Sequence, residues 1–117
     1  MNEDILDLKE FLERVQDDKE LLVELLNIYE EDLKSKRKTL EDALKSNNYD
    51  EVRSIAHSLK GASGNISAKA LCVLFLQLED MGKNKNLSGF ENILTKIDQQ
   101  FQTLQKRMTE IKKELSS

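Results

Sequence analysis

The strongest constraint on the fold is the periodic apolar pattern of residues 90–115. Apolar side chains recur there at alternating steps of four and three residues, at Phe90, Leu94, Ile97, Phe101, Leu104, Met108, Ile111 and Leu115. This spacing places all of them on one face of an α-helix, because a strand would need alternation at every second residue. A helix of about seven turns with one apolar face has to cover that face with other helices.

Residues that break helices are scarce in the rest of the chain. Its 117 residues include four glycines and no proline, the residue types that turns and sheet corners need. We therefore expect an all-α fold. The length is close to the commonest domain size, so we expect a single domain over residues 1–117.

Polar clusters divide the chain into five expected helices, at residues 5–15, 17–45, 49–65, 67–82 and 90–115. The expected start and stop signals are the N-caps Asp17 (with Glu20), Asn48 (with Glu51) and Ser67, and the C-terminal stop Gly82. Short connections force consecutive helices to run antiparallel. The prediction is an up-down-up-down four-helix bundle with a short extra N-terminal helix.

Charge and hydropathy exclude several classes of protein. The chain carries 18 Lys and Arg against 22 Asp and Glu, without a basic block, so no nucleic-acid partner is expected. Its longest apolar stretch, residues 71–76, is far shorter than the roughly 20 residues that cross a bilayer. Cys72 is the only cysteine, which excludes an intramolecular disulfide, and the acidic N-terminus lacks the order of a secretory signal. We expect a cytoplasmic monomer without membrane contact, and the Met1 start favours a separate protein.

The only histidine lies on the polar face of the helix expected over residues 49–65. The opposite, apolar face consists of Val52, Ile55, Ala56, Leu59, Ala62 and Ile66, whereas the polar rows contain Arg53, His57, Lys60, Gly61 and Gly64. Each glycine inside a helix costs about 1 kcal/mol relative to alanine, so we expect a partner to approach closely there. Neutral imidazole is a nucleophile near neutral pH, and the nearby Lys60 supplies a cation for an oxyanion. These features predict a phosphorylatable histidine.

Residues 56–68 read Ala-His-Ser-Leu-Lys-Gly-Ala-Ser-Gly-Asn-Ile-Ser-Ala, and Leu78-Glu79 and Gly82 follow on the next expected helix. This pattern resembles the signature of histidine-containing phosphotransfer (HPt) domains, and the resemblance covers nearly the whole chain. Ser67 stands where the family usually has glycine between the helices.

The resemblance implies that His57 accepts a phosphoryl group from an aspartate of one receiver domain and delivers it to an aspartate of another. Lys60 would stabilise the phosphoryl oxygens and Glu79 would orient the imidazole, with Gln77 as the weaker alternative. Gly61 and Gly64 would clear space for the receiver domain. Arg53 is a further candidate for docking or phosphate contact.

The implied partners are the receiver domains of a hybrid histidine kinase and of a response regulator. These domains are expected to bring the Mg²⁺, and no cofactor is expected on this chain. Neither GxGxxG nor GxxxxGK[ST] occurs, so we expect no nucleotide site, no autokinase activity and no enzyme in the ordinary sense.

One alternative from another class remains open at this stage. The face with His57, Gly61 and Gly64 would also suit a non-catalytic helical adaptor, an inactive HPt-like protein in which the histidine is incidental. A metal-binding bundle is disfavoured, because the chain has one histidine and lacks paired Glu-x-x-His motifs. Phosphorylation of His57 separates the carrier from the adaptor.

Overall fold

The computed structural model describes residues 2–116, and within them all regular structure is helical. This confirms the predicted all-α class. The helices are α1 (Asn2–Ile5), α2 (Leu8–Arg14), α3 (Lys19–Lys45), α4 (Tyr49–Asn65), α5 (Lys69–Lys83) and α6 (Phe90–Ser116).

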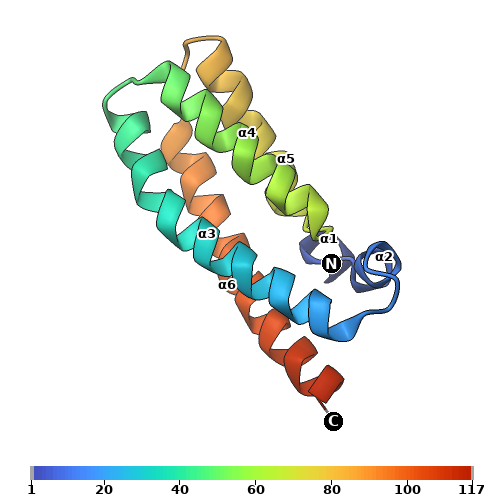
Figure 1. Cartoon of the computed structure of the whole chain (residues 1–117). Helices are drawn as coiled ribbons and strands as arrows, with labels where there is room; N and C mark the ends of the chain where they lie inside the picture. Colours follow the sequence, from blue (N-terminus) through green and yellow to red (C-terminus); the bar gives the residue numbers. More distant parts are fainter. Residues whose placement is uncertain (1, 117) are drawn as a thin grey trace.

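The four long helices α3 to α6 lie along one long axis, and each runs opposite to the helix before it (Figure 1). The molecule measures 47 × 23 × 22 Å, which suits helices of 27 residues at 1.5 Å per residue. Helices α4 and α5 form the most closely packed pair. The short helices α1 and α2 lie at the end of the bundle where α4 connects to α5 (Figure 1). Within residues 2–116, no helix combines the length and the hydropathy needed to cross a membrane.

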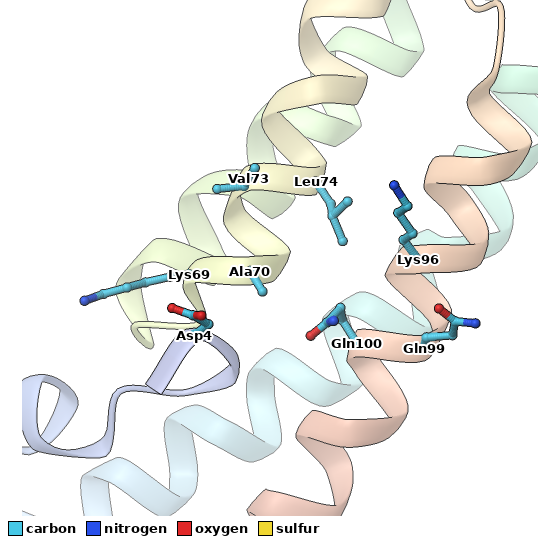
Figure 2. A pocket seen from close by; sticks show the side chains of 8 residues that line it. All are labelled: Asp4, Lys69, Ala70, Val73, Leu74, Lys96, Gln99 and Gln100. Atoms are coloured by element: carbon cyan, nitrogen blue, oxygen red, sulfur yellow. The ribbon is translucent and has the colours of Figure 1, made fainter. Parts of the chain in front are cut away.

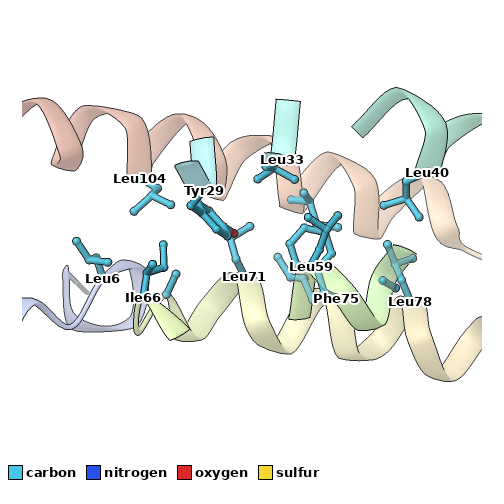
Figure 3. Close-up of a cluster of buried hydrophobic side chains, with 14 of the residues drawn as sticks. Leu6, Tyr29, Leu33, Leu40, Leu59, Ile66, Leu71, Phe75, Leu78 and Leu104 are labelled. Atoms are coloured by element: carbon cyan, nitrogen blue, oxygen red, sulfur yellow. The ribbon is translucent and has the colours of Figure 1, made fainter. Parts of the chain in front are cut away.

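The core runs along the bundle axis and takes side chains from every long helix (Figure 3). In α6, the periodic face predicted from residues 90–115 points inward. Five of its eight members are buried, namely Leu94, Ile97, Leu104, Met108 and Ile111. The other three, Phe90, Phe101 and Leu115, pack against the core as partly buried side chains. The apolar stripe of α6 is therefore bundle core, as its spacing predicts.

One buried polar contact joins α3 to α4. Ser63 is fully buried, and its hydroxyl donates to the carbonyl of Leu59 at 2.7 Å. The hydroxyl of Tyr29 therefore donates to Ser63 Oγ, at 2.7 Å. Burial raises the pKa of Tyr29, so this phenol stays protonated. Because both hydroxyls need a partner inside the core, the bond favours one register between the two helices.

The N-terminal segment differs from the prediction of one short helix over residues 5–15. It forms two helices, because the Asp7 carboxylate accepts from the backbone N–H of Glu10 at 3.1 Å and caps the start of α2.

The N-cap of α3 also differs from the prediction. It is Asp18, which accepts from Leu21 N at 3.0 Å, and not Asp17. Asp17 has a φ of 61° and belongs to the turn before the helix.

Ser67 is not the N-cap that the sequence predicts. The N-cap of α5 is Ala68, which makes no side-chain capping bond. Ser67 instead has a φ of 62°, and the bonds Ser67 N to Gly64 O (3.0 Å) and Ala68 N to Ser63 O (2.9 Å) surround it. This is the Schellman arrangement that ends helices, in which the left-handed position usually holds glycine.

Gly82 does not end its helix, contrary to the prediction. α5 continues to Lys83, and the left-handed residue that follows its C-cap Asn84 is Lys85, with a φ of 54°. Gly82 is instead a buried residue of the helix interior that faces the backbone of α4. Its glycine is explained by helix packing and not by helix termination.

Candidate functional site

Helix α4 carries the site and is oriented by its cap and its buried face. Asn48 Oδ1 accepts from Glu51 N at 3.3 Å, and Asn48 Nδ2 donates to the carboxylate of Glu51 at 2.9 Å, which confirms the predicted N-cap. The opposite face is buried through Val52, Ala56 and Leu59. The sole histidine therefore points away from the core, as predicted, and 67% of its side chain is exposed.

The imidazole of His57 contacts a carboxylate on the neighbouring helix. Its Nδ1 lies 2.6 Å from Glu79 Oε2, and Lys60 Nζ donates to Glu79 Oε1 at 2.7 Å. The hydrogen bond from Lys60 is the main cause that lowers the pKa of Glu79, and the bond from His57 adds to it. Glu79 is thus ionised at neutral pH and can only accept hydrogen bonds. Of the two candidates on α5, Glu79 and not Gln77 makes the contact with the imidazole.

This contact selects one tautomer of the neutral imidazole. Because Glu79 accepts at Nδ1, the proton of His57 belongs on Nδ1, and the lone pair is left on Nε2. Only 14% of the Glu79 side chain is exposed, whereas most of the imidazole is in solvent. Nε2 is therefore a nucleophilic nitrogen that a partner can reach, and the bond from Nδ1 to Glu79 fixes the orientation of the ring.

A hollow of about 420 Å³ lies beside the imidazole. It is lined by His57 and Glu79 together with Asp50, Arg53 and Ser54. Arg53 is exposed one turn before His57, and its guanidinium makes no ion pair with any residue between 4 and 115. The cation of Arg53 is therefore available to an anion that enters the hollow.

The two glycines on this face have different surroundings. A Cβ on Gly61 would meet nothing within 4 Å, so this position is open space beside the imidazole. A Cβ on Gly64 would lie 3.9 Å from Cys72 Sγ on α5, which is ordinary van der Waals contact. Gly61 therefore presents bare backbone to solvent, and Gly64 sits at the edge where α4 meets α5.

A further cation near the site had no signal in the sequence. Lys36, from α3, donates to Ser58 Oγ at 3.0 Å and pairs with Asp32 at 3.1 Å. Ser58 directly follows His57, so this lysine lies on the α3 side of the imidazole face. Helical periodicity does not predict it, because the contact depends on how α3 packs against α4.

A second hollow, of about 370 Å³, shares no residue with the first. It lies between α1, α5 and α6, and is lined by Asp4, Lys69, Ala70, Val73, Leu74, Lys96, Gln99 and Gln100 (Figure 2). These side chains include no imidazole or thiol. Nor do residues 2–116 contain a group of three or more His, Cys, Asp or Glu side chains placed to hold a metal ion. Of these two hollows, only the first is lined by an imidazole, that of His57, with a carboxylate that orients it.

The family model described as the Hpt domain matches residues 24–113, which is most of the chain and includes the whole His57 site. The chain belongs to the Hpt domain family. This confirms the resemblance drawn from residues 56–68, and it supports a phosphotransfer role in two-component phosphorelay signalling.

Structural comparison gives the same fold for this Hpt protein. It is similar to the crystal structure of the HPT domain from the Hpt sensor hybrid histidine kinase of Shewanella, with a TM-score of 0.81 and 18% sequence identity. The similarity covers 98% of this chain and 99% of the other. No curated protein matches the sequence significantly.

Proposed function

We propose that this Hpt protein is a phosphoryl carrier of a multistep phosphorelay. His57 takes the group from an aspartyl phosphate of one receiver domain and passes it to an aspartate of another. The observation that carries the proposal is the bond between Nδ1 and Glu79 on an imidazole that is 67% exposed. It leaves Nε2 as the nucleophile on the accessible side.

The transfer step then needs no proton movement at the reacting atom. The Nε2 lone pair attacks phosphorus, the N–P bond forms, and the bond from phosphorus to the aspartyl oxygen breaks, which returns a carboxylate to the receiver. The ring becomes a cation that keeps its Nδ1 proton, and the ionised Glu79 stabilises this charge. In the reverse step an aspartate oxygen attacks phosphorus and the electron pair returns to Nε2.

Two cations support the phosphoryl group in this proposal. Lys60 lies one turn from His57, and its ammonium can turn from Glu79 toward the phosphoryl oxygens as charge develops. Arg53 lines the hollow next to the imidazole and has no ion-pair partner among the described side chains. Open space at Gly61 lets a receiver domain bring its aspartate to Nε2, and Gly64 extends the same face.

The partners proposed are the receiver domains of a hybrid histidine kinase and of a response regulator. The receiver domains supply the acidic pocket and the Mg²⁺, and this chain binds no cofactor of its own. The carrier acts as a cytoplasmic monomer, a single domain over residues 1–117 built as an antiparallel four-helix bundle with extra N-terminal helices. It is an intermediate in transfer and not an autokinase.

Phosphate uptake from a receiver tests the function. A purified receiver domain, phosphorylated with acetyl phosphate and Mg²⁺, is mixed with the chain, and we expect acid-labile, base-stable phosphate on the chain. His57→Gln should abolish uptake and change the stability by no more than about 0.5 kcal/mol, because glutamine is a surface replacement that can still donate to Glu79.

Gln77→Ala is the matched control, since Gln77 is exposed on α5 but does not contact the imidazole. It should take up phosphate like the wild type. Undiminished uptake by His57→Gln refutes the assignment of the histidine. Receiver binding without any phosphate uptake by the wild type favours the adaptor function instead.

A further inference from the structure

At Gly82 the backbones of α4 and α5 approach each other closely. A Cβ built on Gly82 would lie 2.9 Å from Arg53 N and 2.9 Å from Tyr49 O, and 3.2 Å from Arg53 Cα. Real Cβ atoms essentially never come within 3.0 Å of a heavy atom elsewhere in the structure, apart from their own and neighbouring residues. All three neighbours belong to the backbone, so no side-chain rotation can relieve the overlap. Only glycine permits this separation of the two helices.

This close approach lies one turn from the contact between His57 and Glu79. Along α4, Arg53 precedes His57 by four residues, and along the antiparallel α5, Glu79 precedes Gly82 by three. The other glycine at this helix pair, Gly64, has room for a methyl group. Of these two glycines, the one with no room for a side chain therefore lies one turn from the contact between His57 and Glu79.

We propose that Gly82 is a positioning residue for the phosphoryl acceptor. Its missing side chain sets the separation at which one Glu79 carboxylate reaches His57 Nδ1 at 2.6 Å and Lys60 Nζ at 2.7 Å together. Helix termination does not explain the glycine, because α5 continues past it. The effect of Gly82 on transfer rests on the proposed function, whereas its effect on the imidazole does not.

An added methyl group has a defined consequence for the imidazole. Ordinary contact begins at 3.4 Å, so Gly82→Ala has to separate the helices locally by roughly half an ångström. Both bonds to Glu79 then lengthen, and the Nδ1–H form of His57 loses its acceptor. Displacements of this size at a reacting group slow a reaction, and we expect transfer about three- to tenfold slower.

The first test measures the tautomer of the His57 imidazole. A Gly82 that only stabilised the fold would leave this tautomer unchanged on substitution. Nitrogen-15 NMR of the ring at about pH 8.5, where an ordinary imidazole is neutral, distinguishes Nδ1–H from Nε2–H. The wild type should be mainly Nδ1–H, and Gly82→Ala should shift the population toward Nε2–H. Gly61→Ala is the control for this readout, because its methyl group enters open space and should leave the tautomer as in the wild type.

The second test asks whether Gly82 acts through Glu79. In a double-mutant cycle, Gly82→Ala should slow single-turnover transfer when Glu79 is present. In a chain that already carries Glu79→Ala, it should have little further effect. Additive losses would mean that Gly82 acts by another route, and a wild-type tautomer in Gly82→Ala would overturn the proposal directly.

Glu79→Asp keeps the proposal falsifiable if Gly82→Ala does not fold. It retracts the carboxylate by one methylene without touching the contact between the helices, and should produce the same shift toward Nε2–H. A wild-type tautomer in Glu79→Asp would show that the close approach is not needed, and would refute the proposal. A wild type that takes up no phosphate would refute the carrier function alone, since the tautomer measurements need no phosphorelay.

Discussion

Glu79 contacts both residues to which the proposed transfer assigns a direct role, His57 and Lys60. One oxygen of its carboxylate binds His57 and the other binds Lys60, and only 14% of its side chain is exposed. The ammonium that is to stabilise the phosphoryl group thus also keeps the orienting carboxylate ionised. In the proposed transfer, Lys60 therefore acts in two ways, by its charge near the phosphoryl oxygens and through its bond to Glu79.

Replacement of Lys60 should affect chemistry more than binding. We expect Lys60→Ala to slow transfer by roughly 10- to 1,000-fold, the effect of losing one or two charge-assisted contacts of about 1.5–3 kcal/mol each, while receiver affinity changes much less. Lys60→Arg should keep part of the rate, because the charge remains but its planar fork places the donors differently.

The measurement pairs a single-turnover transfer rate with the dissociation constant for an unphosphorylated receiver. An equal loss of rate and affinity in Lys60→Ala would make Lys60 a docking residue and remove its role in transfer.

At the scale of elements, the turn between α4 and α5 combines an unfavourable backbone with a favourable hydrogen bond. Ser67 is left-handed, and its buried hydroxyl donates to Glu10 Oε1 in α2 at 2.7 Å. A left-handed non-glycine residue costs about 1–2 kcal/mol, and a hydrogen bond contributes about 0.5–1.5 kcal/mol. The hydrogen bond of Ser67 therefore roughly offsets the backbone strain, which the glycine of the family pattern would not have.

Two substitutions separate these contributions. Ser67→Ala loses the bond and keeps the strain, so it should cost about 0.5–1.5 kcal/mol. Ser67→Gly loses the bond but relieves the strain, and should stay within about 0.5 kcal/mol of the wild type. Urea unfolding of both variants measures the difference. Equal stabilities for the two would mean that the backbone at Ser67 is not strained.

At Gly61, on the exposed face of α4, we expect helix stability and access for a receiver domain to have opposite requirements. Gly61→Gln should raise the stability by about 0.5–1 kcal/mol, because glutamine is a better helix former and the position is open. Its side chain should also block a receiver domain beside the imidazole. Urea unfolding and transfer kinetics test the two effects, and transfer at the wild-type rate would show that Gly61 does not provide clearance.

Across the whole molecule, an ion pair on the surface joins two of the long helices, α3 and α6. Arg37 on α3 donates to both oxygens of Asp98 on α6 at 2.8 Å, and also pairs with Glu41 at 2.8 Å.

Several carboxylates have lowered pKa values because of such contacts. Lys45 and Arg37 together lower the pKa of Glu41 to about 2, with Lys45 the larger cause. The pKa values of Glu79, Asp7 and Glu10 are also lowered, through bonds to Lys60, a backbone N–H and Ser67 respectively.

The fold should therefore lose stability in acid. These carboxylates bind protons less tightly in the folded chain than in the unfolded one. Their contribution is therefore complete above the ordinary pKa values of 3.8 for Asp7 and 4.5 for the glutamates, and it is lost as the pH falls, down to about 2 for Glu41. We expect the melting temperature to fall through that window, and Glu41→Gln to make the fall less steep. Circular dichroism melts at several pH values measure this, and a melting temperature that stays constant down to pH 3 would contradict it.

Much of the helical framework was predictable from the sequence because it depends on neighbours along the chain. The spacing of Leu94, Ile97 and Leu104 determines which face of α6 is apolar, and Asn48 caps α4 through a bond to a residue only three positions away. The outward direction of His57 follows from the same periodicity. The candidate phosphoacceptor was therefore identifiable before the tertiary structure.

Only the tertiary structure decided the contacts between elements. Ser67 looked like a cap and Gly82 like a stop, because a sequence does not reveal that one is the left-handed end of α4 and the other touches the backbone of α4. The resemblance suggested Glu79 as a partner of the imidazole, but the nitrogen that it binds and its bond to Lys60 came from the packing of α5 on α4. Local preferences act over a few residues and identify helices and their faces, whereas distances of a few tenths of an ångström between helices result from the packing of the whole core.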